Sequence, residues 1–396
     1  MMQISPETQL FICEHSSDDV HALALQAKKY PDIDMPTAIT QIAGRKVAAE
    51  KIPSWWEIEK IWYPKHLSLE QCSSEITARY KARLLQGDSL TDLTGGFGID
   101  CSFLATGFKS VTYVERQEEL CEIAAHNYPV LNLNHINIRN EDGVTYLQAM
   151  SPVDCLFLDP ARRNEHGGKT VAISDCEPNV AELEELLLQK ANRVMIKLSP
   201  MLDLSLALKE LKQTQEVHIL SVNNECKELL ILLGQTSPEE ISIHCVNLFT
   251  KGTQKEQHFV FTREQEQCSE CTYTDSLETY LYEPNASLLK AGAFRSIAAA
   301  YPVRKLHPNS HLYTSDTFIE NFPGRIFRIV NQCSFNKKEV KENLADLKKA
   351  NVTVRNFPAT VAELRKRIHL AEGGDTYLFA STLNNGQKVL IRCEKV

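Results

Sequence analysis

Long apolar runs are missing from this chain of 396 residues. No stretch approaches the ~20 consecutive apolar residues that a helix needs to cross a bilayer, so we expect no membrane segment. The first residues, MMQISPETQLFICEHSSDDV, are polar and do not form a signal-peptide pattern. The twelve cysteines follow no compact spacing, which argues against a disulfide-stapled secreted domain. We therefore expect free thiols and a cytoplasmic location.

Cysteine pairs with metal-ligand spacing are also scarce. Cys268 and Cys271 form a single C-x-x-C, and a zinc site would need a second ligand pair at matching spacing. No such pair is evident, so we expect no metal and a loop or turn that bears two thiols.

Positive charge is scarce overall but concentrated at one end. The net charge is −8, yet residues 325–396 hold 14 Lys and Arg against 7 Asp and Glu, so this segment carries +7 and the rest carries −15. Such asymmetry favours contact between the basic segment and a polyanion. The alternative is a solvated helix face, because several of the lysines are interleaved with acids.

Four regions follow from the hydrophobic patterns. Residues 1–86 show helical spacing, and residues 87–240 alternate short apolar strands with helices. Residues 241–323 form a β-rich connector, and residues 324–396 predict a strand–helix–strand–helix–strand–strand sandwich. In the second region the strands SLTDL, SVTYV, LNLNHINI, VDCLFLD and RVMIKLS are nearly continuous apolar runs. They predict a doubly wound parallel sheet of the α/β class, covered on both faces.

A glycine loop follows the first of these strands. Asp92-Leu93-Thr94-Gly95-Gly96-Phe97-Gly98-Ile99-Asp100 leads from strand to helix, and its glycines allow backbone to approach a ligand closely. A dinucleotide fingerprint needs a third glycine, but Cys101 stands at that position. Asp92 would repel a pyrophosphate but could anchor the ammonium of an aminoacyl group. Glu115, at the end of the second strand, is placed to accept both hydroxyls of a ribose.

Further polar residues follow the later strands. Asp142 could accept from an adenine amino group or cap the following helix, and both could hold. Asp159, at the end of the fourth strand, and Lys197, at the end of the fifth, reach the same sheet edge, where ligands of open α/β sheets bind. Arg162 follows Asp159, and Gly167 and Gly168 predict a mobile loop nearby.

These residues resemble the class I S-adenosylmethionine-dependent methyltransferases over approximately residues 89–234. The pair EVHILSV and LLILLG is similar to the closing reversed strand of that family. With QCSSEITARYKA, LDPARR, IKLSP and the terminal sandwich, nearly the whole chain resembles a bacterial subfamily with a THUMP-like, ferredoxin-like C-terminal domain.

The resemblance implies S-adenosylmethionine as cofactor, held by the glycine loop and the strand-end acids. The cofactor candidates are Asp92, Thr94, Gly95, Gly96, Phe97, Gly98, Asp100, Glu115, Asp142 and Asp159. It also implies a structured RNA substrate, tRNA or rRNA, docked through residues 324–396. Methyltransferases of exocyclic base nitrogens usually carry Asp/Asn-Pro-Pro-aromatic, but Ala161 and Arg162 stand at its last two positions here, so the target atom stays open.

The catalytic candidates are Asp159, Arg162 and Lys197. We expect direct in-line methyl transfer, in which Asp159 orients or deprotonates the nucleophile and Arg162 clamps a phosphate or base edge. Two alternatives stay open at this point. One is a methyltransferase of small molecules or proteins, and the other is a non-catalytic RNA-binding protein that retains the cofactor fold.

Overall fold

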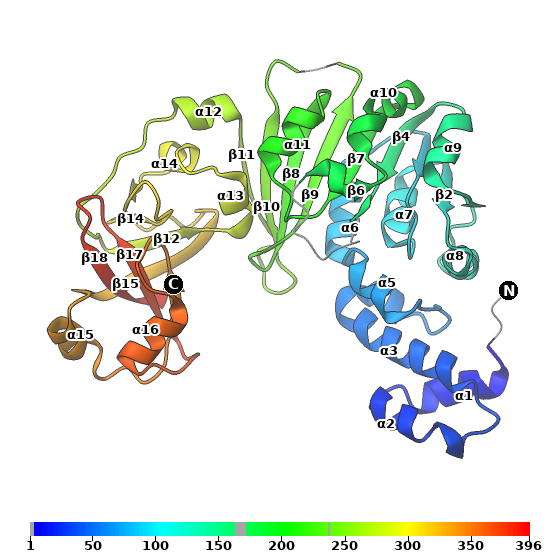
Figure 1. Ribbon diagram of the computed structural model, residues 1–396, viewed down its shortest axis with the longest axis horizontal. Helices are drawn as coiled ribbons and strands as arrows, with labels where there is room; N and C mark the ends of the chain where they lie inside the picture. The colour runs from blue at the N-terminus through cyan, green and yellow to red at the C-terminus, as the bar shows by residue number, and fades with distance from the viewer. Residues whose placement is uncertain (1–3, 163–171, 237) are drawn as a thin grey trace. The chain divides into compact units, whose positions relative to one another are not determined.

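The computed structural model describes residues 4–162, 172–236 and 238–396 (Figure 1). They form two compact units. The first comprises Met1–Gln215 and Leu229–Pro238, and the second comprises Glu216–Glu228 and Glu239–Val396. The division falls within strands β8 (Thr214–Val222) and β9 (Glu225–Gly234).

The first unit begins with helices, coloured blue in Figure 1. They are α1 (Pro6–Glu14), α2 (Val20–Leu25), η1 (Ala27–Lys29), α3 (Met35–Lys51), α4 (Pro53–Trp56), α5 (His66–Gln71) and α6 (Glu75–Ala82). The longest, α3, begins where Asp34 accepts a hydrogen bond from the Thr37 amide and Pro36 occupies the first turn. Trp55 and Tyr63 are buried with Phe97 in one apolar cluster, which packs these helices onto the glycine loop.

Strands and helices then alternate along the chain. The strands are β1 (Ser89–Asp92), β2 (Ser110–Glu115), β3 (Ile136–Asn140), β4 (Val153–Leu158) and β7 (Ala191–Leu198). The helices are α7 (Ile99–Leu104), η2 (Ala105–Gly107), α8 (Glu118–Val130), α9 (Gly143–Ala149), η3 (Ile173–Asp175), α10 (Val180–Lys190) and α11 (Leu204–Glu210), and a short ribbon pairs β5 (Ala161–Arg162) with β6 (Cys176–Glu177).

The sheet of the first unit has the order β3-β2-β1-β4-β7-β9. Its pairs are parallel except the last, since β9 runs antiparallel to β7. This reversed strand is the one that EVHILSV and LLILLG predict. The central strands β4 and β7 are buried almost throughout, as expected for a parallel sheet covered on both faces.

One predicted strand begins later than its apolar pattern suggests. The run LNLNHINI predicts a strand from Leu131, but β3 begins at Ile136. The Leu131 amide still donates to the Asn127 carbonyl, and Asn132 has φ 61°. A left-handed residue of this kind ends a helix, so the first half of the run completes α8.

In the second unit, β8 pairs in parallel with β10 (Ser242–Leu248), and β10 pairs antiparallel with β11 (Glu256–Phe261). Helix α12 (Arg263–Cys268) follows. A seven-stranded sheet has the order β13-β14-β12-β15-β18-β17-β16. Its first members and their helices are β12 (Tyr280–Pro284), α13 (Ala286–Ala291), α14 (Ser296–Ala300), β13 (Arg304–Lys305) and β14 (Tyr313–Ser315).

The predicted terminal sandwich is present. It consists of β15 (Gly324–Ser334), α15 (Lys337–Leu344), β16 (Asn351–Val354), α16 (Val361–Ile368), β17 (Thr376–Thr382) and β18 (Lys388–Lys395). Thr360 and Glu363 form a capping box that starts α16. The α/β class with an α+β C-terminal part is therefore confirmed.

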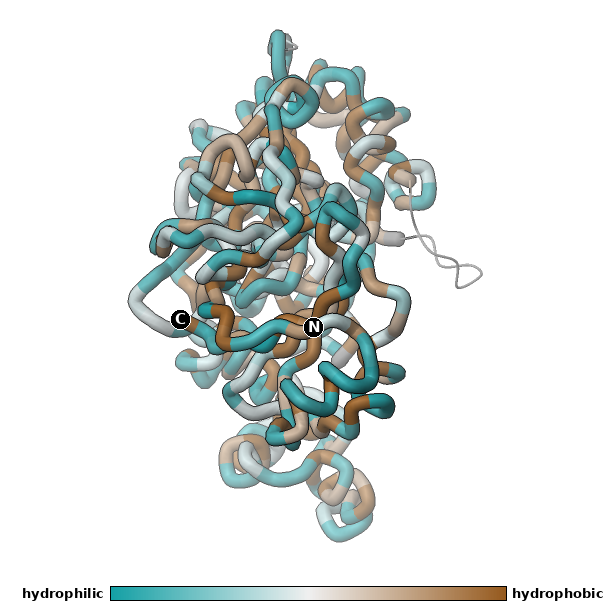
Figure 2. Tube along the Cα trace, turned by 90° about the vertical axis from the view of Figure 1, so that its left-hand side faces the viewer, coloured by the Kyte–Doolittle hydropathy of each residue, from teal (hydrophilic) through white to brown (hydrophobic). Residues whose placement is uncertain are grey.

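Hydrophobic and hydrophilic residues alternate over short stretches of the trace in Figure 2. Among the described residues, no helix combines the length and apolar character that a bilayer crossing requires.

Candidate active site

The glycine loop connects β1 to α7 in a conformation that requires glycine at two positions. Gly98 has φ 85°, a left-handed value that residues with a side chain rarely adopt. A Cβ at Gly95 would overlap the ring of Tyr113, which comes from the neighbouring strand β2. The loop therefore lies directly against the end of β2, where Glu115 is found.

Two acids at neighbouring strand ends border this loop. Glu115 is 8% exposed; its Oε2 accepts from the Gly96 amide at 2.8 Å and its Oε1 from the Gln117 amide at 2.9 Å. Asp92 is 1% exposed, and its Oδ1 accepts from the Thr94 amide at 3.0 Å. Its Oδ2 is buried and has no hydrogen-bond partner among the described residues. Burial raises the pKa of Asp92 well above its usual range, and the nearby carboxylates add to the rise.

Asp142 caps helix α9. Its Oδ1 accepts from the amides of Val144 and Thr145 at 3.1 and 2.9 Å. A Cβ at Gly143 would overlap the carbonyl oxygen of Leu93, so this helix start abuts the glycine loop. The capping role is thus observed, and the adenine contact stays a prediction.

Asp159 is tied to the loop and to the fifth parallel strand. Its amide donates to the Thr94 hydroxyl at 2.6 Å, and its Oδ2 accepts from the Lys197 ammonium. The Asp159 side chain is 37% exposed, whereas that of Lys197 is 10% exposed. Burial raises the pKa of Asp159, and the Lys197 ammonium opposes part of that rise.

Asp100 joins a buried charge network that the sequence did not reveal. Its Oδ1 lies 3.0 Å from the Lys81 ammonium, and its Oδ2 lies 3.8 Å from that of Lys197. Ser73 donates to Asp100 at 2.7 Å and accepts from Lys81 at 2.8 Å. Burial raises the pKa of Asp100, but the two ammonium groups outweigh it, so the net pKa is lowered.

The Lys81 side chain is 0% exposed although it comes from helix α6, outside the predicted cofactor region. Helical spacing in SSEITARYKA places Lys81 four residues after Thr77, which is also buried. That spacing was the only sequence signal for it. Asp100 was predicted to bind the cofactor; in the structure its carboxylate joins Lys81 to Lys197.

Most of the predicted residues meet at one sheet edge. Hydrogen bonds and ion pairs connect Thr94 to Asp159 and Gly96 to Glu115, and the network of Lys197 reaches Asp100. Phe97 differs: its side chain is 4% exposed and packs on Trp55 at 5.2 Å between ring centroids. The Arg162 backbone pairs with Cys176, but its side chain, Gly167 and Gly168 lie outside the described residues.

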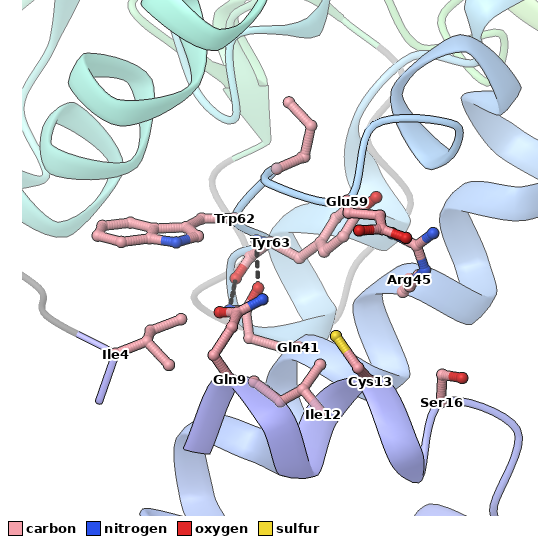
Figure 3. A pocket seen from close by; sticks show the side chains of 11 residues that line it. Ile4, Gln9, Ile12, Cys13, Ser16, Gln41, Arg45, Glu59, Trp62 and Tyr63 are labelled. Carbon is pink, nitrogen blue, oxygen red and sulfur yellow. Dashed lines mark hydrogen bonds between the residues drawn. The ribbon is translucent and has the colours of Figure 1, made fainter. Parts of the chain in front are cut away.

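A separate cavity of about 110 Å³ lies among the N-terminal helices (Figure 3). Gln41 and Tyr63 exchange two hydrogen bonds of 2.9 Å beside it. None of the predicted site residues lines this cavity, so it is no part of the candidate active site.

The comparisons with known proteins decide the family. A solved structure of a candidate methyltransferase from Porphyromonas gingivalis W83 is 34% identical to this chain, with a TM-score of 0.87 and 100% of both chains covered. Family models match residues 280–323 as a ferredoxin-like domain and residues 324–395 as a THUMP domain-like region. The chain belongs to the class I methyltransferases with a THUMP-like C-terminal domain. The resemblance drawn from its motifs is thereby confirmed.

Two further structures are less similar to this methyltransferase chain. A candidate methyltransferase of Streptococcus mutans, solved with SAH, is 14% identical and covers 40% of this chain and 96% of its own, with a TM-score of 0.30. The tRNA m1G37 methyltransferase of M. jannaschii is 11% identical and covers 41% and 50%, with a TM-score of 0.30. Such low scores support no argument about this chain. No curated protein matches it.

Proposed function

We propose that this chain transfers a methyl group from S-adenosylmethionine to a base of structured RNA. The observation that carries the proposal is the buried Oδ2 of Asp92, which has no hydrogen-bond partner among the described residues. A buried carboxylate oxygen without a donor is costly, and a ligand ammonium beside the glycine loop would satisfy it. An aminoacyl ligand therefore fits this position, whereas a phosphate would be repelled.

Glu115 complements Asp92 at the next strand end. Its carboxylate is held by the Gly96 and Gln117 amides, which fix its orientation before any ligand arrives. A carboxylate oxygen has more than one acceptor site, so each oxygen can accept a ribose hydroxyl as well. The two acids thus suit the aminoacyl and ribose parts of S-adenosylmethionine, and the glycine loop lies between them.

The chemistry that the chain must supply is orientation and removal of a proton. Bound S-adenosylmethionine supplies a methyl group that its sulfonium already activates. We propose that Oδ1 of Asp159 contacts the nucleophilic atom of the substrate, because Oδ2 already accepts from the Lys197 ammonium. Asp159 would accept the proton that the nucleophile gives up on methylation, and its raised pKa makes it a better base than an ordinary aspartate. Lys197 is the positioning residue, and Arg162 stays our candidate clamp for a phosphate or base edge.

The THUMP-like region supports RNA as the substrate. Its helices α15 and α16 bear exposed basic side chains, namely Lys337, Lys338, Lys341, Lys366 and Arg367, and Lys348 and Lys349 are exposed just beyond α15. Arg365 is half-buried and lies 3.4 Å from Glu372. Lys366 and Arg367, which follow it, are both exposed. Such side chains would neutralise phosphates and give affinity more than sequence choice.

The test is incubation of the purified chain with tritiated S-adenosylmethionine and total RNA, followed by identification of the labelled nucleoside. We expect label in RNA with the unaltered chain and almost none with Asp159→Asn. Label that appears only in protein or small-molecule fractions would overturn the RNA substrate. Failure to bind S-adenosylmethionine in calorimetry would overturn the whole proposal.

A further inference from the structure

A cluster of histidines lies in the second unit, on three paired strands. Glu216 and His218 are two residues apart on β8, so their side chains point to the same face. Strand β10 pairs with β8 in a register that sets His244 beside His218. Strand β11 sets His258 opposite Val246, which shares a face with His244. The register therefore gathers three imidazoles and a carboxylate on one face.

The donor atoms of this cluster are close enough to share an ion. His218 Nε2 lies 3.2 Å from Glu216 Oε2, and the rings of His218 and His244 stack with centroids 4.3 Å apart. One donor atom from each of Glu216, His218 and His244 lies within 4.8 Å of the other two. The His218 side chain is 3% exposed, whereas that of Glu216 is 34% exposed. An ion would thus be held by a buried ligand on one side and be reached from solvent on the other.

A fourth group orients one of these ligands. His244 Nδ1 lies 3.1 Å from Nε2 of His258, so one ring donates to the other. Metal-binding histidines commonly use one nitrogen for the ion and the other for such an outer hydrogen bond. The hydrogen bond to His258 therefore occupies Nδ1 of His244 and leaves its Nε2 for an ion.

We propose that Glu216, His218 and His244 bind a divalent transition metal ion of the zinc class and so tie β8 to β10. Two imidazole nitrogens and one carboxylate oxygen form a ligand set that zinc, cobalt and nickel accept. His258 is the positioning residue for His244. The proposal is independent of the methyl transfer proposed above, because none of these residues belongs to the candidate active site. It differs from the expectation of no metal, which weighed only cysteine spacing.

The experiment uses the full chain, freed of metal with a chelator and titrated with Co²⁺ and then with Zn²⁺ against a chromophoric chelator. We expect one equivalent to bind. Glu216→Gln and His244→Gln should each weaken binding by more than 100-fold, and His258→Gln should weaken it by about 10–100-fold, the usual effect of an outer partner. His21→Gln, at an exposed histidine of α2, is the matched control and should leave binding unchanged.

Two further measurements distinguish loss of the metal site from misfolding and from binding at the cysteines. His218 is buried, so its replacement can fail to fold; Glu216→Gln alters a more exposed side chain and keeps its size. Zn²⁺ should raise the thermal midpoint of the unaltered chain but not that of Glu216→Gln. An intense thiolate-to-cobalt charge-transfer band that disappears in Cys268→Ser/Cys271→Ser would place the ion at the cysteines instead. That result would overturn the proposal. So would an affinity of Glu216→Gln and His244→Gln equal to that of the unaltered chain, or the absence of any bound ion.

Discussion

Replacing Lys81 with methionine should destabilise the first unit strongly, although Lys81 lies outside the predicted cofactor loop. The lysine is 0% exposed, and its ammonium pairs with Asp100 at 3.0 Å and with the Ser73 hydroxyl at 2.8 Å. Lys81→Met leaves a buried carboxylate with one remaining cation, because the Lys197 ammonium stays 3.8 Å from Asp100 Oδ2. Removing one partner of a buried ion pair costs about 3–5 kcal/mol. The remaining cation places our expectation near the lower end, about 3 kcal/mol.

The assay is urea unfolding followed by tryptophan fluorescence. All three tryptophans, at positions 55, 56 and 62, lie in the first unit, so the signal reports the unfolding of that unit alone. For a slope of about 2–3 kcal/mol per molar urea, the expected loss moves the midpoint down by roughly 1–1.5 M. Lys109→Met removes a lysine from an exposed pair with Asp88 and should leave the midpoint unchanged.

The loss of stability in Lys81→Met should also depend on pH and on the presence of Asp100. The folded pKa of Asp100 is lowered, so its contribution to stability is present above the unfolded pKa of about 3.9 and is lost as pH falls through the folded pKa. Without Lys81 that pKa rises. The gap between the two proteins should therefore be widest near neutral pH and narrow below about pH 4. In an Asp100→Asn background, Lys81→Met should cost much less. If Lys81→Met costs the same in both backgrounds, or costs nothing in the otherwise unaltered chain, the Lys81–Asp100 ion pair does not stabilise the first unit.

Four further predictions concern the proposed function. Glu115→Ala should weaken S-adenosylmethionine binding by about 2–3 kcal/mol in calorimetry, and unchanged affinity in a folded variant would remove Glu115 from the ribose role. Asp159→Ala should leave cofactor binding largely intact and lower turnover by a factor on the order of 10²–10⁴. Lys197→Met should move the acidic limb of the rate profile to higher pH, because the ammonium that opposes the rise in the Asp159 pKa is lost; an unmoved limb would argue against Asp159 as base. Reversing the charge at Arg365, Lys366 and Arg367 should weaken RNA binding and make its dependence on salt shallower, and an unchanged salt slope would contradict docking through α16.

Charge reversal is a better test of RNA docking than truncation before Arg325. Strand β15 lies between β12 and β18 in the seven-stranded sheet, and Tyr280, Leu281 and Tyr282 of β12 pair with it directly. Truncation would strip a central strand and expose the edge of β12, so a loss of RNA binding would not separate docking from stability. The exposed side chains of Lys366 and Arg367 can be altered without that loss.

The sheet, the reversed strand and the glycine loop could all be predicted from the amino-acid sequence. Each rests on short-range patterns: continuous apolar strands, glycines where backbone must turn, and acids at strand ends. Because parallel strands end at one edge of a sheet, even the meeting of Asp92, Glu115 and Asp159 could be anticipated. The late start of β3 could not, since LNLNH has the alternation of a strand and only the left-handed Asn132 shows that the helix ends there.

The contacts between charged groups and between rings of different elements could not be predicted in this way, because they depend on how the elements pack. Nothing local to α6 says that its Lys81 is buried against Asp100, because that contact depends on how the N-terminal helices pack on α7. Likewise His218 and His244 are far apart in the sequence, and a shift of one residue in the pairing of β8 with β10 would send them to opposite faces. Strand register is set by the packing of the whole sheet. For that reason a cysteine pair was weighed as a metal site from the sequence, and the histidine cluster was not.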